Sequence, residues 1–302
     1  MKVHHLNCIS TYPLGGKLMD ASTESFFHRG HLVNHCLLVE SEDELILINA
    51  GLGTRDVETP HARLSGFFLS LVSPQLRIEL TAVEQIQRMG FRPQDVRHMI
   101  LTHLDFDQAG GLDDFPWAQV HLMHAERDAA FSQDTWMDRQ RYRPQQWGTK
   151  ANWKVYRPTE GKDWFGFGRV QQLEGLSRDI AMIPLIGPSL GHAGVAVKQK
   201  DRWLLHAGNA YFFRHEIDFK KPWCTSGLTL YQKMLEKDGP SRLMNQNRLR
   251  DLRKHHSNEI QIFCSHDVEE FERLSGRPAD IPVLKDCGIN PLFTSRLPHL
   301  HF

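Results

Sequence analysis

The chain has 302 residues, 40% of them hydrophobic, and its 36 basic side chains are balanced by 36 acidic ones. A formal charge of zero gives no global attraction for nucleic acid or an anionic membrane, and no stretch approaches the ~20 apolar residues that cross a bilayer. The first residues lack the apolar run of a signal peptide, and the five cysteines show no C-x-x-C spacing. We therefore expect a soluble cytoplasmic protein with free thiols, and neither a disulfide framework nor a zinc ribbon.

Hydrophobic periodicity and turn residues predict strands and helices along the whole chain. In chain order they are a hairpin over 33–50, a helix over 81–90, strands over 96–102 and 120–123, a helix from about 125, strands over 180–186, 194–198 and 203–207, a helix over 228–235, further helix, and a strand over 260–264. Because strands followed by helices occur in both halves, the pattern favours an α/β layered architecture.

No long linker divides the chain, so we expect one domain over 1–276 and a C-terminal tail over 277–302 that lies over the body or reaches a neighbouring subunit. Residues 132–168 are rich in Trp, Arg, Gln and Pro and show no clean strand alternation. We interpret them as a helical and irregular insertion over one end of the sheet.

The most informative segment is LTHLDFDQAGGL, residues 101–112, where a predicted strand ends. His103, Asp105 and Asp107 alternate with apolar residues, so in an extended segment their side chains would point the same way. Imidazole nitrogen and carboxylate oxygen are the ligands that zinc, manganese and iron(II) accept. The segment therefore predicts a metal site.

This segment resembles the H-x-H-x-D-H signature of the metallo-β-lactamase superfamily, in the variant with Asp at its second position. Other landmarks occur in the family's order: N-A-G-L-G after the hairpin, G-H-A-G with His192, L-L-H-A-G-N-A-Y with Asn209, and F-C-S-H-D with His266. The resemblance is nearest the acyl-homoserine-lactone lactonase-like branch. It implies an α/β (α+β) fold, a four-layer αββα sandwich with the metal site at one edge between two sheets.

The resemblance divides the implied ligands into two metal sites. The first comprises His103, Asp105 and His192; the second comprises Asp107, Gln108 and His266, with Asn209 at the bridging position. In hydrolytic members a metal-activated water attacks the substrate while a metal polarises the substrate oxygen.

Three positions depart from the family pattern. Gln108 stands where His is usual, Asn209 where Asp is usual, and Asn49 begins N-A-G in place of Asp-Thr-Gly. Amide oxygens are poorer zinc ligands than imidazole or carboxylate and cannot bridge two cations as a carboxylate does. We expect one tightly held divalent metal in the first site, zinc before manganese or iron, and a weak or empty second site.

The leading functional hypothesis is a metal-dependent hydrolase acting on a lactone or other small ester, in which Asp107 orients or deprotonates the attacking water. The alternative is a degenerate, non-hydrolytic member that serves as a binding or interaction protein. A redox or oxygen-handling iron protein is disfavoured, since no flavodoxin-like or rubredoxin-like extension is visible. For partners we expect a small-molecule substrate, no nucleic acid and no membrane; a homodimer is left open.

For the other polar residues considered, a structural role is favoured over a role in the site. Related lactonases place an oxyanion-stabilising tyrosine near the bridging residue, but Tyr211 is one position short of that spacing, so core packing is favoured over a catalytic role. Arg141, Arg143 and Lys150 could meet an anionic substrate, but a solvated face is favoured. The remaining histidines in or beside strands are interpreted as structural: His4, His5, His121, His124 and His206.

Overall fold

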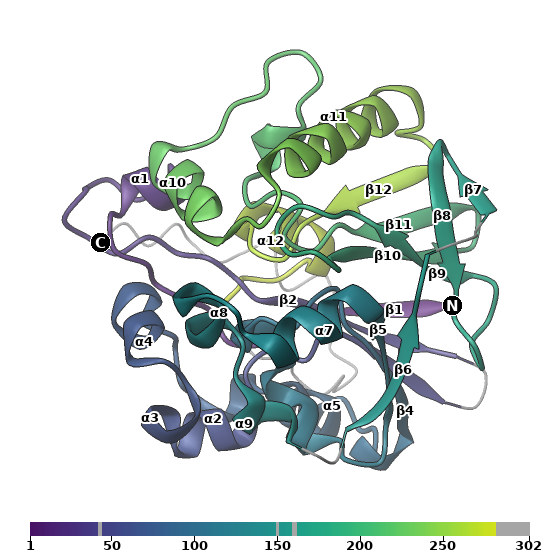
Figure 1. Cartoon of the computed structure of the whole chain (residues 1–302), viewed down its shortest axis with the longest axis horizontal. Helices are drawn as coiled ribbons and strands as arrows, with labels where there is room; N and C mark the ends of the chain where they lie inside the picture. Colours follow the sequence, from purple (N-terminus) through teal and green to yellow (C-terminus); the bar gives the residue numbers. More distant parts are fainter. Residues whose placement is uncertain (42–43, 149–150, 159–161, 282–302) are drawn as a thin grey trace, which may run out of the picture.

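Two β-sheets pack face to face, and helices cover both outer faces (Figure 1). The computed structural model describes residues 1–41, 44–148, 151–158 and 162–281. One hydrophobic cluster lies between the sheets, and another lies on the outer face of each sheet. The expected four-layer αββα sandwich is confirmed.

The first sheet has the strand order β1-β2-β3-β4-β5-β6. Its strands are β1 (Lys2–Asn7), β2 (His35–Glu40), β3 (Leu45–Ile48), β4 (Val96–Ile100), β5 (Gln119–Met123) and β6 (Asn152–Tyr156). The antiparallel pair β2 and β3 confirms the predicted hairpin, and β3 to β6 are parallel. On β2, Leu37 packs between the sheets and Leu38 packs on the helix side. Burial of both faces explains the unbroken apolar run of this strand.

The second sheet has the order β12-β11-β10-β9-β8-β7. Its strands are β7 (Lys162–Trp164), β8 (Phe167–Gln172), β9 (Ile180–Pro184), β10 (Ala193–Gln199), β11 (Arg202–His206) and β12 (Ile260–Phe263). All neighbours are antiparallel except β11 and β12, which are parallel. The four strands predicted after residue 180 are thus confirmed.

Helices cover the sheets and fill the connections. The α-helices are α1 (Lys17–Asp20), α2 (Thr54–Glu58), α3 (Pro60–Arg63), α4 (Gly66–Val72), α5 (Ala82–Arg88), α6 (Phe106–Ala109), α7 (His124–Ser132), α8 (Trp136–Arg141), α9 (Pro144–Trp147), α10 (Ser226–Leu235), α11 (Gly239–His255) and α12 (Val268–Ser275). Short 3-10 turns are η1 (Ile78–Leu80), η2 (Pro93–Asp95), η3 (Gly110–Asp114) and η4 (Arg214–Ile217). Across the described parts of the chain, no helix has both the length and the hydrophobicity to span a bilayer.

The predicted insertion over 132–168 is only partly helical. It contains α8 and α9, but β6 and β7 are strands at the edges of the two sheets. An edge strand is paired on one side and half exposed, so its polar residues, such as Asn152 and Lys154, mask the alternation. Lys150 lies outside the described residues, as does the predicted tail beyond 281; the described part of the tail contacts the body through Asp280, which accepts a hydrogen bond from Tyr12.

Candidate metal centre

The predicted ligand residues meet where strands from both sheets end. His103 follows β4, His266 follows β12, and His192 directly precedes β10. Backbone hydrogen bonds tie these loops together: the amide of Ala193 donates to the carbonyl of Thr102 at 2.9 Å. The resulting site is buried, with exposures of 4% or less for His103, Asp105, Gln108, His192, Asn209 and His266.

The alternating pattern predicted an extended segment from His103 to Asp107, but only its first part is extended. Helix α6 begins at Phe106 with Asp105 at its N-cap position, so Asp107 is carried by the first turn of a helix. The two carboxylates consequently have different partners. Asp105 contacts Arg141, and Asp107 lies 3.7 Å from the Nε2 atom of His266.

Arg141 contacts one ligand of the first predicted site, Asp105. Its Nε and Nη2 atoms donate to the two carboxylate oxygens of Asp105 at 2.6 and 2.7 Å. Its Nη1 atom donates to the carbonyls of Pro188 at 3.1 Å and Leu235 at 2.7 Å. With 1% of Arg141 exposed, the expectation of a solvated arginine is wrong, because the side chain is buried by its charge partner and two carbonyls.

The charges in this pair hold each other ionised. Burial by itself raises the pKa of Asp105, but the positive charge of Arg141, the neighbouring His103 and their hydrogen bonds together outweigh it and hold that pKa well below its ordinary value. Burial likewise lowers the pKa of Arg141, but the charge of Asp105, the hydrogen bond to it and the nearby Tyr142 and Glu126 together outweigh burial, so the pKa is raised. Asp105 is therefore a carboxylate whose charge is already neutralised within the protein.

Both ring nitrogens of His192 are also engaged. Its Nδ1 atom lies 2.9 Å from the carbonyl of Leu185, and its Nε2 atom accepts the backbone amide of Asn209 at 2.8 Å. Burial lowers the pKa of His192 well below its ordinary value, so the ring is neutral. With Asp105 and His192 both engaged, the first predicted site offers fewer free donor atoms than the second, and which site binds a metal more tightly stays a prediction.

In the second predicted site, by contrast, donor atoms are left without hydrogen-bond partners. The Nδ1 atom of His266 lies 2.9 Å from the carbonyl of Val33, which leaves its Nε2 atom free. Among the described residues, four buried atoms at the predicted ligand positions have no hydrogen-bond partner: His266 Nε2, His103 Nε2, Gln108 Oε1 and Asn209 Oδ1. Native proteins satisfy nearly all buried polar atoms, so this group indicates a missing partner. Of these atoms, His266 Nε2 lies 3.7 Å from the carboxylate of Asp107.

This donor set is not a fully formed zinc site. Among the described residues, no three His, Cys, Asp or Glu side chains are grouped so as to hold a metal. Asp107 and His266 would supply the carboxylate and the imidazole, and the remaining donors would be the amide oxygens of Gln108 and Asn209 or the ring of His103. Such a set suits a harder cation better than a site of three histidines does.

The hydroxyl of Tyr211 is directed to a different part of the molecule. It donates to the carboxylate of Glu270, with both oxygens at 3.1 Å, and the side chain is fully buried in the core of the second sheet. The next residue, Phe212, instead stacks on His266 with ring centroids 4.6 Å apart. Core packing, the default for Tyr211, agrees with these contacts.

Glu126 is a residue of the site that sequence reasoning missed. It is fully buried at the start of α7; its Oε1 atom accepts the amide of Leu104 at 2.9 Å and its Oε2 atom accepts the hydroxyl of Ser189. It thereby connects the loop of His103 and Asp105 to the loop that precedes His192. A Cβ atom on Gly191 would lie 2.0 Å from the amide nitrogen of Glu126, which explains the glycine before His192.

The space around the centre is small in this conformation. A cavity of about 10 Å³ lies against Asp105, Arg141, Asn209 and Phe212, too small for any substrate. The side chain of Asp107 is 13% exposed. Access is therefore more open on the side of Asp107 than on the side of Asp105.

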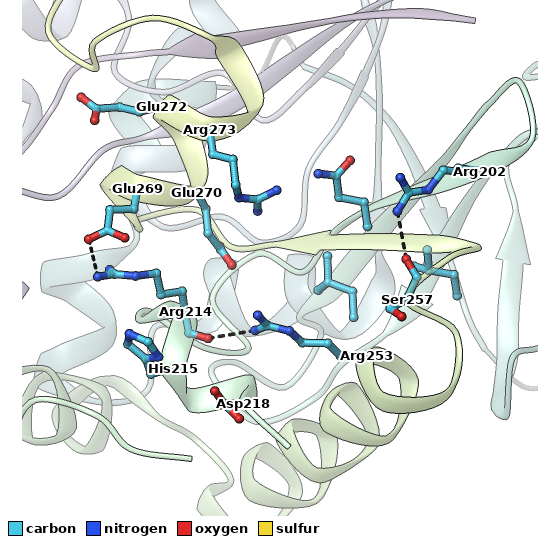
Figure 2. A pocket seen from close by; sticks show the side chains of 13 residues that line it. Arg202, Arg214, His215, Asp218, Arg253, Ser257, Glu269, Glu270, Glu272 and Arg273 are labelled. Carbon is cyan, nitrogen blue, oxygen red and sulfur yellow. Dashed lines mark hydrogen bonds and ion pairs between the residues drawn. The ribbon is translucent and has the colours of Figure 1, made fainter. Parts of the chain in front are cut away.

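A much larger cavity, of about 640 Å³, lies elsewhere, between α11, α12 and β12. Figure 2 shows Glu270 and Arg253 extending into it from α12 and α11. Its arginines are partly engaged: Arg214 pairs with Glu269, and Arg253 donates to the carbonyl of Arg214. None of the predicted metal ligands lines this cavity.

Glu270 in the wall of this cavity predicts a pH-dependent stability. Burial, reinforced by the charge of Asp267, raises the pKa of Glu270 from 4.5 to about 8. Between these values the folded protein keeps a proton that the unfolded chain has lost, so the free energy of unfolding falls as the pH rises. We expect Glu270→Gln to remove about 1.4 kcal/mol of this dependence per pH unit, measured by urea denaturation from about pH 5 to 8.

Glu269→Gln is the matched control, since this carboxylate on the same helix is 61% exposed. Its stability should follow that of the wild-type protein across the pH range. Parallel curves for Glu270→Gln and the wild type would contradict the assignment of the slope to Glu270.

Comparison with known proteins places this geometry in a family. Residues 29–233 match the family described as the metallo-beta-lactamase superfamily. A "probable metallo-hydrolase" of Mycobacterium tuberculosis is 34% identical over 274 residues, which cover 90% of this chain and 82% of that protein. An N-acyl homoserine lactonase of Bacillus cereus is 30% identical over 122 residues, 39% of this chain and 49% of the lactonase.

Solved structures agree on the fold. An N-acyl homoserine lactone hydrolase, solved with N-hexanoyl-L-homoserine at its catalytic metal centre, superposes with a TM-score of 0.67 at 20% identity, covering 90% of this chain and 95% of that one. The sandwich, the order of the landmarks and the match over most of the chain all lead to the same assignment. The chain belongs to the metallo-β-lactamase superfamily.

Proposed function

We propose that this protein is a metal-dependent hydrolase acting on a lactone or another small carboxylic ester. The observation that carries the proposal is the group of four buried polar atoms without partners on His103, Gln108, Asn209 and His266. Leaving one such atom unsatisfied costs about 1–3 kcal/mol, and a cation bound among the four would remove that cost. The lactonases among its relatives and structural neighbours support the substrate class.

Asp107 and His266 would hold the metal, with Gln108, Asn209 and His103 as further donors. A divalent cation bound there supplies a water of lowered pKa and polarises the ester carbonyl. We propose zinc first; manganese or iron tolerates amide oxygens better. One metal per chain is expected from this set.

The protein itself supplies a general base, Asp107, and an apolar side chain beside the site, Phe212. Burial raises the pKa of Asp107, although the neighbouring His266 lowers it, and a carboxylate of raised pKa is a better proton acceptor. One carboxylate oxygen of Asp107 would bind the metal, which lowers this pKa, and the other would orient the attacking water and accept its proton. Phe212, stacked on His266, fixes the imidazole and gives the site an apolar side.

The test is metal content combined with hydrolysis of a panel of N-acyl lactones and small esters after loading with zinc, manganese or iron. We expect metal-dependent turnover, and Asp107→Asn should lower kcat/KM at least ~100-fold without loss of fold. Asp128→Asn is the control, because that carboxylate is 52% exposed on α7, and it should leave kcat/KM unchanged.

Two results would overturn the proposal: no hydrolysis and no retained metal after loading with any of the three cations, or full activity in Asp107→Asn. The first would favour a non-hydrolytic binding protein. It stays a prediction that the protein is cytoplasmic and has no nucleic-acid partner. Whether it forms a homodimer stays open.

A further inference from the structure

The ion pair of Arg141 and Asp105 stands in the first of the two metal sites that the family resemblance implies. We propose that the Arg141 guanidinium is a permanent cation that replaces the metal of this first site, so that the centre accepts at most one divalent metal. The inference rests on the proposed function for the remaining metal, which would bind beside Asp107.

The guanidinium is fixed from three directions. Asp105 at the start of α6 accepts two of its hydrogen bonds, at 2.6 and 2.7 Å. The carbonyl of Pro188 before β10 and that of Leu235 at the end of α10 accept two more, at 3.1 and 2.7 Å. To release Asp105, Arg141 would have to leave two buried carbonyls unpaired, so this pair is not a loose contact that an arriving metal displaces.

The pair also removes the ligands that a first metal needs. Each oxygen of Asp105 accepts a hydrogen bond from Arg141, and the Nε2 atom of His192 accepts the amide of Asn209 at 2.8 Å. Within the described residues, His103 is the one first-site ligand with a nitrogen that lacks a hydrogen-bond partner, and that Nε2 atom lies 3.5 Å from Asp105. A dication there would also repel the guanidinium that shares Asp105. Charge and coordination therefore exclude a metal from the same position.

The test exchanges the ion pair for a ligand. In Asp105→His combined with Arg141→Met, the guanidinium is gone and a third imidazole joins His103 and His192, the donor set of a catalytic zinc. The control, Asp105→Asn with Arg141→Met, removes both charges without adding an imidazole. Each protein is loaded with zinc, dialysed against metal-free buffer and analysed for zinc per folded chain, with folding checked by circular dichroism.

We expect the wild-type protein to retain no more than one zinc. The double variant with Asp105→His should retain one more than the wild type, and the control double variant should gain none. Asp105→His with Arg141 kept should also gain none, because the cation remains. The inference is overturned if the wild type retains two zinc ions, if the double variant gains none, or if Asp105→His alone gains as much.

These outcomes separate the inference from the proposed function. A wild type without zinc and a double variant with one would contradict the proposed metal beside Asp107 and support the role of Arg141. A wild type that holds one zinc and hydrolyses esters, with no gain in the double variant, would contradict the role of Arg141 alone.

Discussion

Arg141→Met is expected to lower the free energy of unfolding by about 3–5 kcal/mol, the range for breaking a buried ion pair from one side. The change leaves the carboxylate of Asp105, which is 3% exposed, without its cation. It also leaves the carbonyls of Pro188 and Leu235 without a donor. Urea denaturation followed by circular dichroism measures the loss.

Two further variants assign the loss to the ion pair. Arg139→Met changes another arginine of the same helix. Arg139 is exposed, and among the described residues its side chain donates only to the carbonyl of Gln133, so the stability of this variant should stay close to that of the wild type. Adding Asp105→Asn to Arg141→Met removes the unpaired charge and should recover part of the stability. Equal stability of Arg141→Met and the wild type would show that Asp105 does not depend on this arginine.

Glu126→Leu is expected to cost about 2–4 kcal/mol, because two buried donors, the amide of Leu104 and the hydroxyl of Ser189, lose their acceptor. The same change frees the loop of His103 and Asp105, so hydrolytic activity should fall together with stability. Thermal unfolding and kcat/KM are the two measurements.

Glu126→Gln is the matched control for this position. Its carbonyl oxygen can still accept the amide of Leu104, and its amide group can donate to the hydroxyl of Ser189, which rotates to accept. Stability and activity should both remain near those of the wild type. A Gln variant as damaged as the Leu variant would show that the negative charge, and not the hydrogen bonds, holds the loop.

The sequence alone was enough to predict the layered αββα architecture of this protein. Strands buried on both faces, such as β2 and β10, require continuous apolar runs, and such runs can be read locally. Polar residues that follow these runs, His103 and His266, identified the edge of the sandwich where the site lies. Edge strands were harder to predict: β6 is half exposed, and its polar positions hide the alternation that would mark it as a strand.

Only the tertiary structure decided which ligand positions remain free. Arg141 and Asp105 are 36 residues apart, and the carbonyl of Leu235 that completes the arginine's contacts is 94 residues beyond Arg141. No local pattern encodes such a meeting, because a buried arginine and an exposed one have the same side chain. The hydrogen bond from Tyr211 to Glu270 likewise joins distant segments, so no local pattern predicts it. Residue type sets what a side chain can bind, whereas burial and the partners brought by distant segments set what it does bind.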